Sequence, residues 1–304
     1  MRVTERLTRR RFLTGTLAVA TAMELQRAAR ALGFAADAEV CKLMAEQEVG
    51  PYYVAGELMR QDIAEGKPGV PLSLRIAVLD VRTCKPLTGA AVDIWHCDAL
   101  GVYSGYTKQS MMGPGGPGFG RDGQGPPPGF PSGPPSGPPP DGGRGPGGPP
   151  ESHPTDKLTF LRGIQMTDAE GAVRFRTVFP GFYMGRTNHI HFKVRLGGHA
   201  DGRTYAAGHA SHVGQVFFPE EFAAKLMEHE PYSRHKIHRT TQAEDAVFGD
   251  QRGELSIAKL MPVGSGGGFE AELVAAVDPT ATPAPAERRG GPGGGPAGPP
   301  PGAR

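Results

Sequence analysis

Short stretches of the chain alternate apolar and polar residues, the pattern of half-buried strands. In 71–80, "PLSLRIAVLD", the large aliphatic side chains fall at every second position, and in 171–178, "GAVRFRTV", Arg174 and Arg176 separate apolar neighbours. Further strands are expected at 90–98, 189–197, 213–218 and 269–278. Glycine, proline and aspartate turns divide these strands, so the pattern predicts an all-β fold, an antiparallel sandwich or barrel.

One helix interrupts this pattern. The stretch "PEEFAAKLMEH" (219–229) predicts a short helix with Pro219 in its first turn and with Phe222 and Leu226 on one face. No segment of the sequence is long and apolar enough to predict a membrane-spanning helix.

Two segments are too poor in apolar residues to form part of a core. The 304 residues include 46 glycines and 31 prolines, concentrated in a low-complexity insertion at 113–152 and in a tail at 279–304. The insertion should be a solvated polyproline-type loop, and the tail should be disordered. The sequence thus predicts one folded domain over 41–278, interrupted by the insertion.

The first 38 residues resemble a twin-arginine export signal. Arg9 and Arg10 stand before "FLTG" and the weakly apolar, small-residue run "TLAVATAM". This resemblance implies a leader over 1–38 and a protein exported to the periplasm or the cell exterior, often with its cofactor in place. The alternative is an amphipathic helix that begins the fold.

Charge and cysteine content exclude some classes of partner and site. The formal net charge of +2 predicts no attraction to nucleic acid or to an anionic membrane. Cys41, Cys84 and Cys97 are too few and too scattered for a thiolate metal site. One disulfide is compatible with export, and the sequence leaves open which two cysteines form it.

The strongest chemical signal lies in "PGFYMGRTNHIHFKV" (180–194). Because side chains alternate along a strand, His189 and His191 share one face and Ile190 and Phe192 share the other. Paired imidazoles suit a transition metal, although two surface histidines would give the same spacing. The strand offers no carboxylate that would complete a two-histidine, one-carboxylate iron site.

Tyrosines accompany these histidines. Tyr183 precedes His189 by six residues, and Tyr103 and Tyr106 follow the strand expected at 90–98. A phenol with a pKa near 10 is a poor ligand at pH 7 unless a strongly charged ion lowers that pKa. Phenolate ligands therefore indicate a trivalent ion.

Four segments in order resemble the intradiol ring-cleavage dioxygenases, and most closely the exported relatives of protocatechuate 3,4-dioxygenase. They are "EQEVGPYY" (46–53), "PLTGAAVDIWHCDALGVYSGY" (86–106), "FLRGIQMTDAEGAVRFRTVFPGFYMGRTNHIHFKV" (160–194) and "GQVFFPEEF" (214–222). The resemblance implies a β-sandwich that holds one non-haem Fe(III) with two tyrosinates, two histidines and a hydroxide. It also implies cleavage of a catechol-type ring between its two hydroxyl-bearing carbons by O2, giving a muconate-type diacid.

The same resemblance assigns roles to individual residues. Tyr103 would be the equatorial tyrosinate and Tyr183 the axial one that leaves when substrate binds, while His189 and His191 complete the metal site. Arg186 matches the active-site arginine of the family. Gln215 matches the glutamine that holds this arginine in place.

The chain departs from the family pattern above the site. Only "MG" separates Tyr183 from Arg186, where protocatechuate dioxygenases have a longer segment with a tryptophan. The roof of the pocket must differ, so the resemblance does not identify the catechol that is cleaved. Tyr52 and Tyr53 match a pocket-lining element of the family, but aromatic side chains are also ordinary core residues.

Other histidines carry weaker signals. His96, beside Trp95, is expected to lie away from the metal. The stretches "HASH" (209–212) and "HEPYSRHKIHR" (229–239) are expected to be exposed loops without metal ligands.

A different class of protein has similar strands and turns. Transthyretin-like and carboxypeptidase-regulatory-like sandwiches bind or space other domains and have no catalytic activity. The set that separates the two classes is Tyr103, Tyr183, Arg186, His189, His191 and Gln215, because a binding module has no need of all six. The sequence leaves self-association open.

Overall fold

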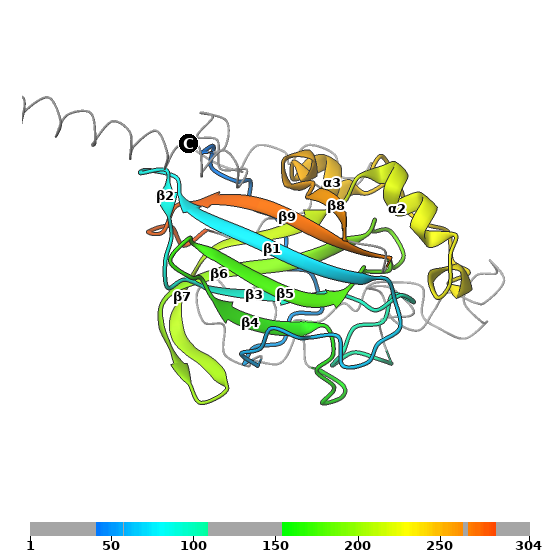
Figure 1. Ribbon diagram of the computed structural model, residues 1–304, viewed down its shortest axis with the longest axis horizontal. Coiled ribbons are helices and arrows are strands. Elements are labelled where there is room, and N and C mark those ends of the chain that lie inside the picture. Colours follow the sequence, from blue (N-terminus) through cyan, green and yellow to red (C-terminus); the bar gives the residue numbers. More distant parts are fainter. Residues whose placement is uncertain (1–40, 57, 109–153, 264–266, 284–304) are drawn as a thin grey trace, which may run out of the picture. The chain divides into compact units, whose positions relative to one another are not determined.

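A computed structural model describes residues 41–56, 58–108, 154–263 and 267–283 (Figure 1). Backbone contacts divide the chain into Met1–Lys42 and Leu43–Arg304, and the fold below is that of the second unit. The expected leader (1–38), insertion (113–152) and most of the expected tail (279–304) lie outside the described residues and stay predictions. Among the helices described, none is long and apolar enough to cross a membrane.

The strands form two sheets, which confirms the predicted all-β fold. One sheet contains β2 (Lys85–Pro86), β1 (Pro71–Asp80), β9 (Gly268–Val277) and β8 (Lys259–Val263) in this order, and β5 (Ala172–Val178) also pairs with β1. The other has the order β4 (Arg162–Met166), β3 (Ala91–Trp95), β6 (His189–Asp201) and β7 (Thr204–Phe217). Figure 1 shows the strands of the two sheets running in similar directions.

One strand pair differs from the antiparallel expectation. β1 and β9 run parallel over nine paired positions, from Leu72–Phe269 to Asp80–Val277. Most of the described chain lies between these strands, so no tight turn forces them to be antiparallel.

The core lies between the sheets. Leu74 and Ile76 of β1 belong to the same buried cluster as Ile190, Phe192 and Val194 of β6. β1 was expected to be half-buried, but its second face is covered as well: Ala77 is fully buried and Arg75 forms an ion pair with Glu272 of β9. Neighbouring strands on both edges of β1 account for this burial.

The expectation for 209–212 was wrong. Instead of an exposed loop, "HASH" is part of β7, which pairs with β6 almost to the tip of their hairpin. His212 is fully buried, and its Nδ1 lies 2.5 Å from Glu46 Oε1. Backbone pairing with β6 determines this strand, although its glycines and alanines show no clear alternation.

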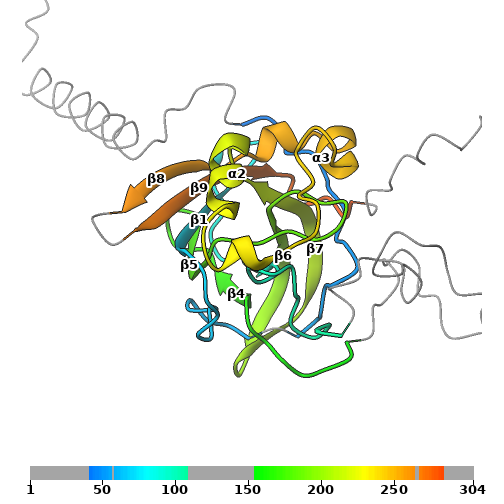
Figure 2. The same ribbon diagram turned by 90° about the vertical axis from the view of Figure 1, so that its right-hand side faces the viewer.

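Two α-helices stand at one end of the strands (Figure 2). α2 (Glu220–Met227) confirms the predicted helix, with Leu226 buried and Phe222 packed against the core; Pro219 is its N-cap and not part of its first turn. α3 (Ala246–Asp250) was not predicted, and Asp245 caps it. Short 3₁₀ turns at Tyr232–Arg234 and Gly253–Ser256 complete this region.

The three cysteines differ in their bonding state. Cys41 and Cys84 are disulfide-bonded, whereas Cys97 carries a free, buried thiol.

Candidate active site

The two histidines of β6 lie on the face of the four-stranded sheet that points away from the core. Ile190 and Phe192, on the opposite face, pack into the buried cluster between the sheets. His189 and His191 are themselves buried, and their Nε2 atoms lie 3.1 Å apart. The alternation of side chains along the strand thus puts both imidazoles on one face of β6, where they are buried side by side.

Hydrogen bonding fixes the orientation of His189. Its Nδ1 lies 2.7 Å from the carbonyl oxygen of Thr187, which can only accept, so Nδ1 carries the proton and Nε2 keeps a lone pair. Burial, reinforced by the charge of Arg186, holds the pKa of His189 well below its usual value. The ring is therefore neutral at pH 7, the form that binds a metal.

His191 is held by packing. Its ring stacks on Trp95 with 4.9 Å between centroids and a 2° angle between planes. Gly50, at φ +69°, lies below the ring, where an added Cβ would be 3.0 Å from Cε1 of His191. Burial and then the neighbouring His189 lower the pKa of His191 well below its usual value. Its Nδ1 finds no hydrogen-bond partner within the described part of the chain.

Tyr103 and Tyr183 face these imidazoles from two loops. The hydroxyl of Tyr103 lies 3.5 Å from Nε2 of His189, and the ring of Tyr183 lies edge-on to His189 with centroids 5.7 Å apart. Tyr52 covers Tyr103, with the rings stacked at 4.5 Å. Arg162 of β4 connects the segment that carries Tyr52 with the loop that carries Tyr103, because it donates to the carbonyl oxygens of Tyr52 and Ser104, each at 2.7 Å.

Asp98 connects the two tyrosine loops. Its N–H donates to Val102 O at 2.9 Å and its carboxylate accepts from Val102 N–H at 3.0 Å, which closes the turn before Tyr103. Its carbonyl accepts from Gly181 N–H at 3.2 Å, two residues before Tyr183. A Cβ on Gly181 would lie 2.4 Å from that carbonyl oxygen, so only glycine permits this approach.

Burial opposes ionisation of both phenols. It raises the pKa of Tyr103 well above its usual value, and it raises the pKa of Tyr183 to about 12 even though the charge of Arg186 acts in the opposite direction. Neither phenol ionises at neutral pH without a further positive charge nearby.

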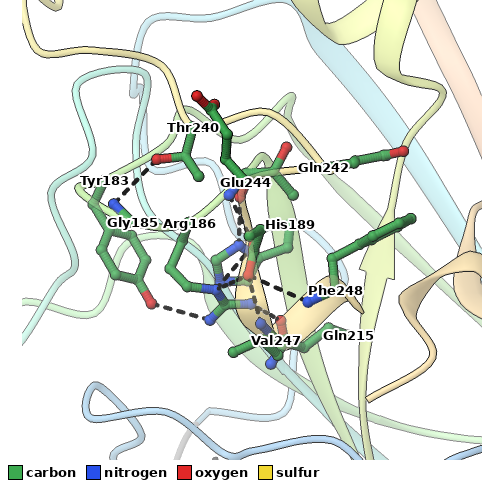
Figure 3. A network of polar contacts seen from close by, with 12 residues as sticks. Tyr183, Gly185, Arg186, His189, Gln215, Thr240, Gln242, Glu244, Val247 and Phe248 are labelled. Atoms are coloured by element: carbon green, nitrogen blue, oxygen red, sulfur yellow. Dashed lines mark hydrogen bonds and ion pairs between the residues drawn. The ribbon is translucent and has the colours of Figure 1, made fainter. Parts of the chain in front are cut away.

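Arg186 lies at the centre of a polar network (Figure 3). Its Nη1 lies 3.4 Å from the hydroxyl of Tyr183 and 3.5 Å from Glu48 Oε1, and its Nη2 donates to Gln215 Oε1. Its Nε lies 3.1 Å from each carboxylate oxygen of Asp245. Burial would lower the pKa of Arg186, but Tyr183, Asp245 and Glu48 raise it above its usual value, so the guanidinium stays charged.

The arrangement fits a trivalent metal ion. The Nε2 atoms of the two histidines converge with a phenol oxygen, and a second phenol lies beside them. Within the described ranges no group of three or more His, Cys, Asp or Glu side chains could hold a metal, so a metal here would need the tyrosine oxygens as ligands. An ion of high charge would also supply the positive charge that the buried phenols lack.

Other candidates lie outside this arrangement. Both ring nitrogens of His96 have partners, Cys97 O and Thr177 Oγ1, each at 2.8 Å, and burial lowers the pKa of His96 to about 4. Tyr106 donates to Tyr53 O at 3.3 Å, and its ring packs against Tyr52 with centroids 5.4 Å apart. The sequence left Tyr52 and Tyr53 open; Tyr52 packs on the site tyrosines, whereas Tyr53 packs on Trp95 and donates to Asp93.

Three polar residues that hold the site were not predicted from the sequence. Glu48 and Asp245 flank Arg186, and Gln47 accepts from the Gln215 backbone N–H at 2.5 Å. A helix N-cap signal in "EDAVFGD" could have placed Asp245 at the start of a helix, but no local pattern connects it to Arg186, 59 residues away.

Two solved structures are similar to this chain over most of its length. Neither a scan against protein-family models nor a search of curated proteins found a match. Among solved structures, an intradiol ring-cleavage dioxygenase from Tetranychus urticae is 30% identical, with a TM-score of 0.61, and the match covers 80% of this chain and 98% of that one. A second solved dioxygenase is also 30% identical over 80% of this chain and 98% of its own, with a TM-score of 0.59.

Proposed function

The chain belongs to the intradiol ring-cleavage dioxygenase family, and we propose that it uses one non-haem Fe(III) and O2 to cleave a catechol-type ring between its two hydroxyl-bearing carbons. The product would be a muconate-type diacid. The observation that carries the proposal is the convergence of two neutral imidazoles and two buried phenols beside a charged guanidinium.

His189, His191, Tyr103 and Tyr183 are the residues that would hold the iron. Bound there, Fe(III) would supply the Lewis acidity that ionises phenols and makes a bound catechol reactive toward O2. The neutral tautomer of His189, fixed by Thr187, presents Nε2 without any loss of a proton.

Tyr183 and Arg186 would handle protons and charge. A phenolate at Tyr183 Oη is stabilised by Arg186 Nη1 at 3.4 Å, and it can accept a proton from a catechol hydroxyl when substrate arrives. Arg186 keeps its charge throughout, so it can stabilise negative charge that develops on the substrate ring. The surrounding aromatic cluster, including Tyr52, excludes water and strengthens this interaction.

The test is the visible spectrum of the purified, iron-loaded protein before and after anaerobic addition of catechol, compared with that of a Tyr183→Phe variant. A tyrosinate-to-Fe(III) absorption band that shifts with catechol and weakens in the variant is the expected result. A protein that stays colourless after iron reconstitution would contradict the proposal and favour the non-catalytic sandwich.

Export by the twin-arginine route is part of the same proposal. Arg9 and Arg10 support it, and a disulfide at Cys41 and Cys84 suits an oxidising compartment. Replacing both arginines by lysine should retain the protein in the cytoplasm, as measured by fractionation of an expressing bacterium. Unchanged export would overturn this part of the proposal.

A further inference from the structure

Asp245 lies beside Arg186, at the start of α3. Its side chain is fully buried, and both of its oxygens lie 3.1 Å from Nε of Arg186. One of these oxygens also accepts from the N–H of Thr187 at 2.9 Å. A single carboxylate thus contacts two consecutive residues of the segment between Tyr183 and His189.

The contact with Thr187 extends to the metal-facing histidine. The N–H of Thr187 donates to Asp245, and the carbonyl of Thr187 accepts the Nδ1 proton of His189 at 2.7 Å. Asp245 therefore fixes the residue that orients the His189 ring.

Asp245 is itself held in place. As the N-cap of α3, it accepts from Val247 N–H at 2.9 Å and from Phe248 N–H at 3.2 Å. Phe248 packs edge-on against Phe217 of β7, the strand that also carries Gln215, with ring centroids 5.0 Å apart. The carboxylate is thus attached to the sheet through a capped helix.

Stability alone does not account for this arrangement. A buried ion pair contributes little net stability, because desolvation offsets most of the attraction between the charges. The hydrogen-bond partners of Arg186 instead restrict the orientation of its guanidinium group. Nε faces Asp245, Nη2 faces Gln215 and Nη1 faces Tyr183. A planar guanidinium held at all three nitrogens has one orientation.

We propose that Asp245 is a positioning residue for ring cleavage, which fixes the guanidinium of Arg186 toward the substrate and, through Thr187, the ring of His189. This inference rests on the proposed function. It adds a residue from the α3 region, outside every motif in the sequence, to the machinery of the site.

The variant that tests it is Asp245→Asn. Asparagine has the same shape and is as good an N-cap, so α3 stays capped, but the negative charge opposite Arg186 is lost. We expect kcat/KM for catechol to fall by about 100-fold per bound iron, mainly through kcat, as for a misplaced group that acts in the transition state. Glu244→Gln, at the adjacent and half-exposed side chain, is the matched control and should leave kcat/KM unchanged.

A double-mutant comparison separates positioning from general damage. In an Arg186→Gln background, Asp245→Asn should cause a much smaller loss of kcat/KM than in the wild type, because the guanidinium that it positions is already absent and only its contact with Thr187 remains to be lost. If the two losses multiply, the proposal is overturned.

A second readout needs neither iron nor turnover. In NMR spectra of the metal-free protein, the signal of the Arg186 Nε–H group is identified by its loss in Arg186→Gln. This hydrogen should exchange with solvent at least about tenfold faster in Asp245→Asn than in Glu244→Gln, because Asp245→Asn removes a charge-assisted hydrogen bond. Equal exchange rates would overturn the inference. A wild type that cleaves no catechol would contradict the proposed function alone, because the exchange rates would still report whether Asp245 holds Arg186.

Discussion

The two faces of β6 perform different tasks within the same few residues. On one face, Ile190 and Phe192 fill the core between the sheets; on the other, His189 and His191 bring two ring nitrogens to within 3.1 Å. The core face is specified by apolar volume alone, whereas the site face depends on individual partners such as Thr187. Stability and chemistry should therefore be separable by substitution at alternate positions.

Substitution on the site face should have the largest effect. His191→Ala removes a proposed metal ligand. Ring-cleavage activity should fall more than about 100-fold, because removing a residue that only holds a metal ligand in place already costs up to about this much. Iron content and turnover are the measurements, with His238→Ala, an exposed histidine, as the control. Retention of full iron content in His191→Ala would remove His191 from the ligand set.

Substitution on the core face should affect stability. Phe192→Ala should lower the free energy of unfolding by about 3–5 kcal/mol, because it opens a cavity in the core. Urea unfolding of the metal-free protein measures this change. A value below about 1 kcal/mol would mean that the core closes around the missing ring.

An imidazole outside the proposed site should be detectable by pH. The unfolded chain protonates His96 near 6.5, whereas burial lowers the pKa of His96 to about 4 in the folded protein. Between these values the unfolded state binds one more proton, so stability falls as pH falls, by about 1.4 kcal/mol per pH unit from this group. The free energy of unfolding in urea, measured from pH 7 to pH 4.5, should depend less steeply on pH in His96→Asn than in the wild type. Identical slopes would contradict the lowered pKa of His96.

The smallest effect should come from trimming one methyl group on the core face. Ile190→Val should cost about 1 kcal/mol of stability and leave kcat per bound iron unchanged. Unfolding and turnover assays on the same preparation test both parts. A clear loss of kcat would show that the two faces of β6 are coupled.

Several residues of the site could be predicted from the sequence because they lie close together in it. Tyr183, Arg186, His189 and His191 lie within nine consecutive residues, and strand alternation places both histidines on one side. The family resemblance selected Tyr103 over Tyr106 and added Gln215, and the fold brings Tyr103 and Gln215 into the same region.

The residues that hold the site were not predictable in this way. Glu48 lies 138 residues from Arg186 and Asp245 lies 59 residues from it, and no periodicity connects positions so far apart. The extension of β7 through 204–212 was missed for a related reason. Pairing with β6 decides its conformation, and the local sequence carries little strand signal.

The position of β9 has a consequence for the order in which the protein can form. This strand lies between β1 and β8, yet it is made after every other described strand. While the ribosome has delivered only residues up to 267, β1 lacks its parallel neighbour and β8 has no strand to pair with. Completion of the five-stranded sheet therefore has to wait for the last stretch of translation, and a chain stopped before Gly268 should be digested by a protease that the full chain resists.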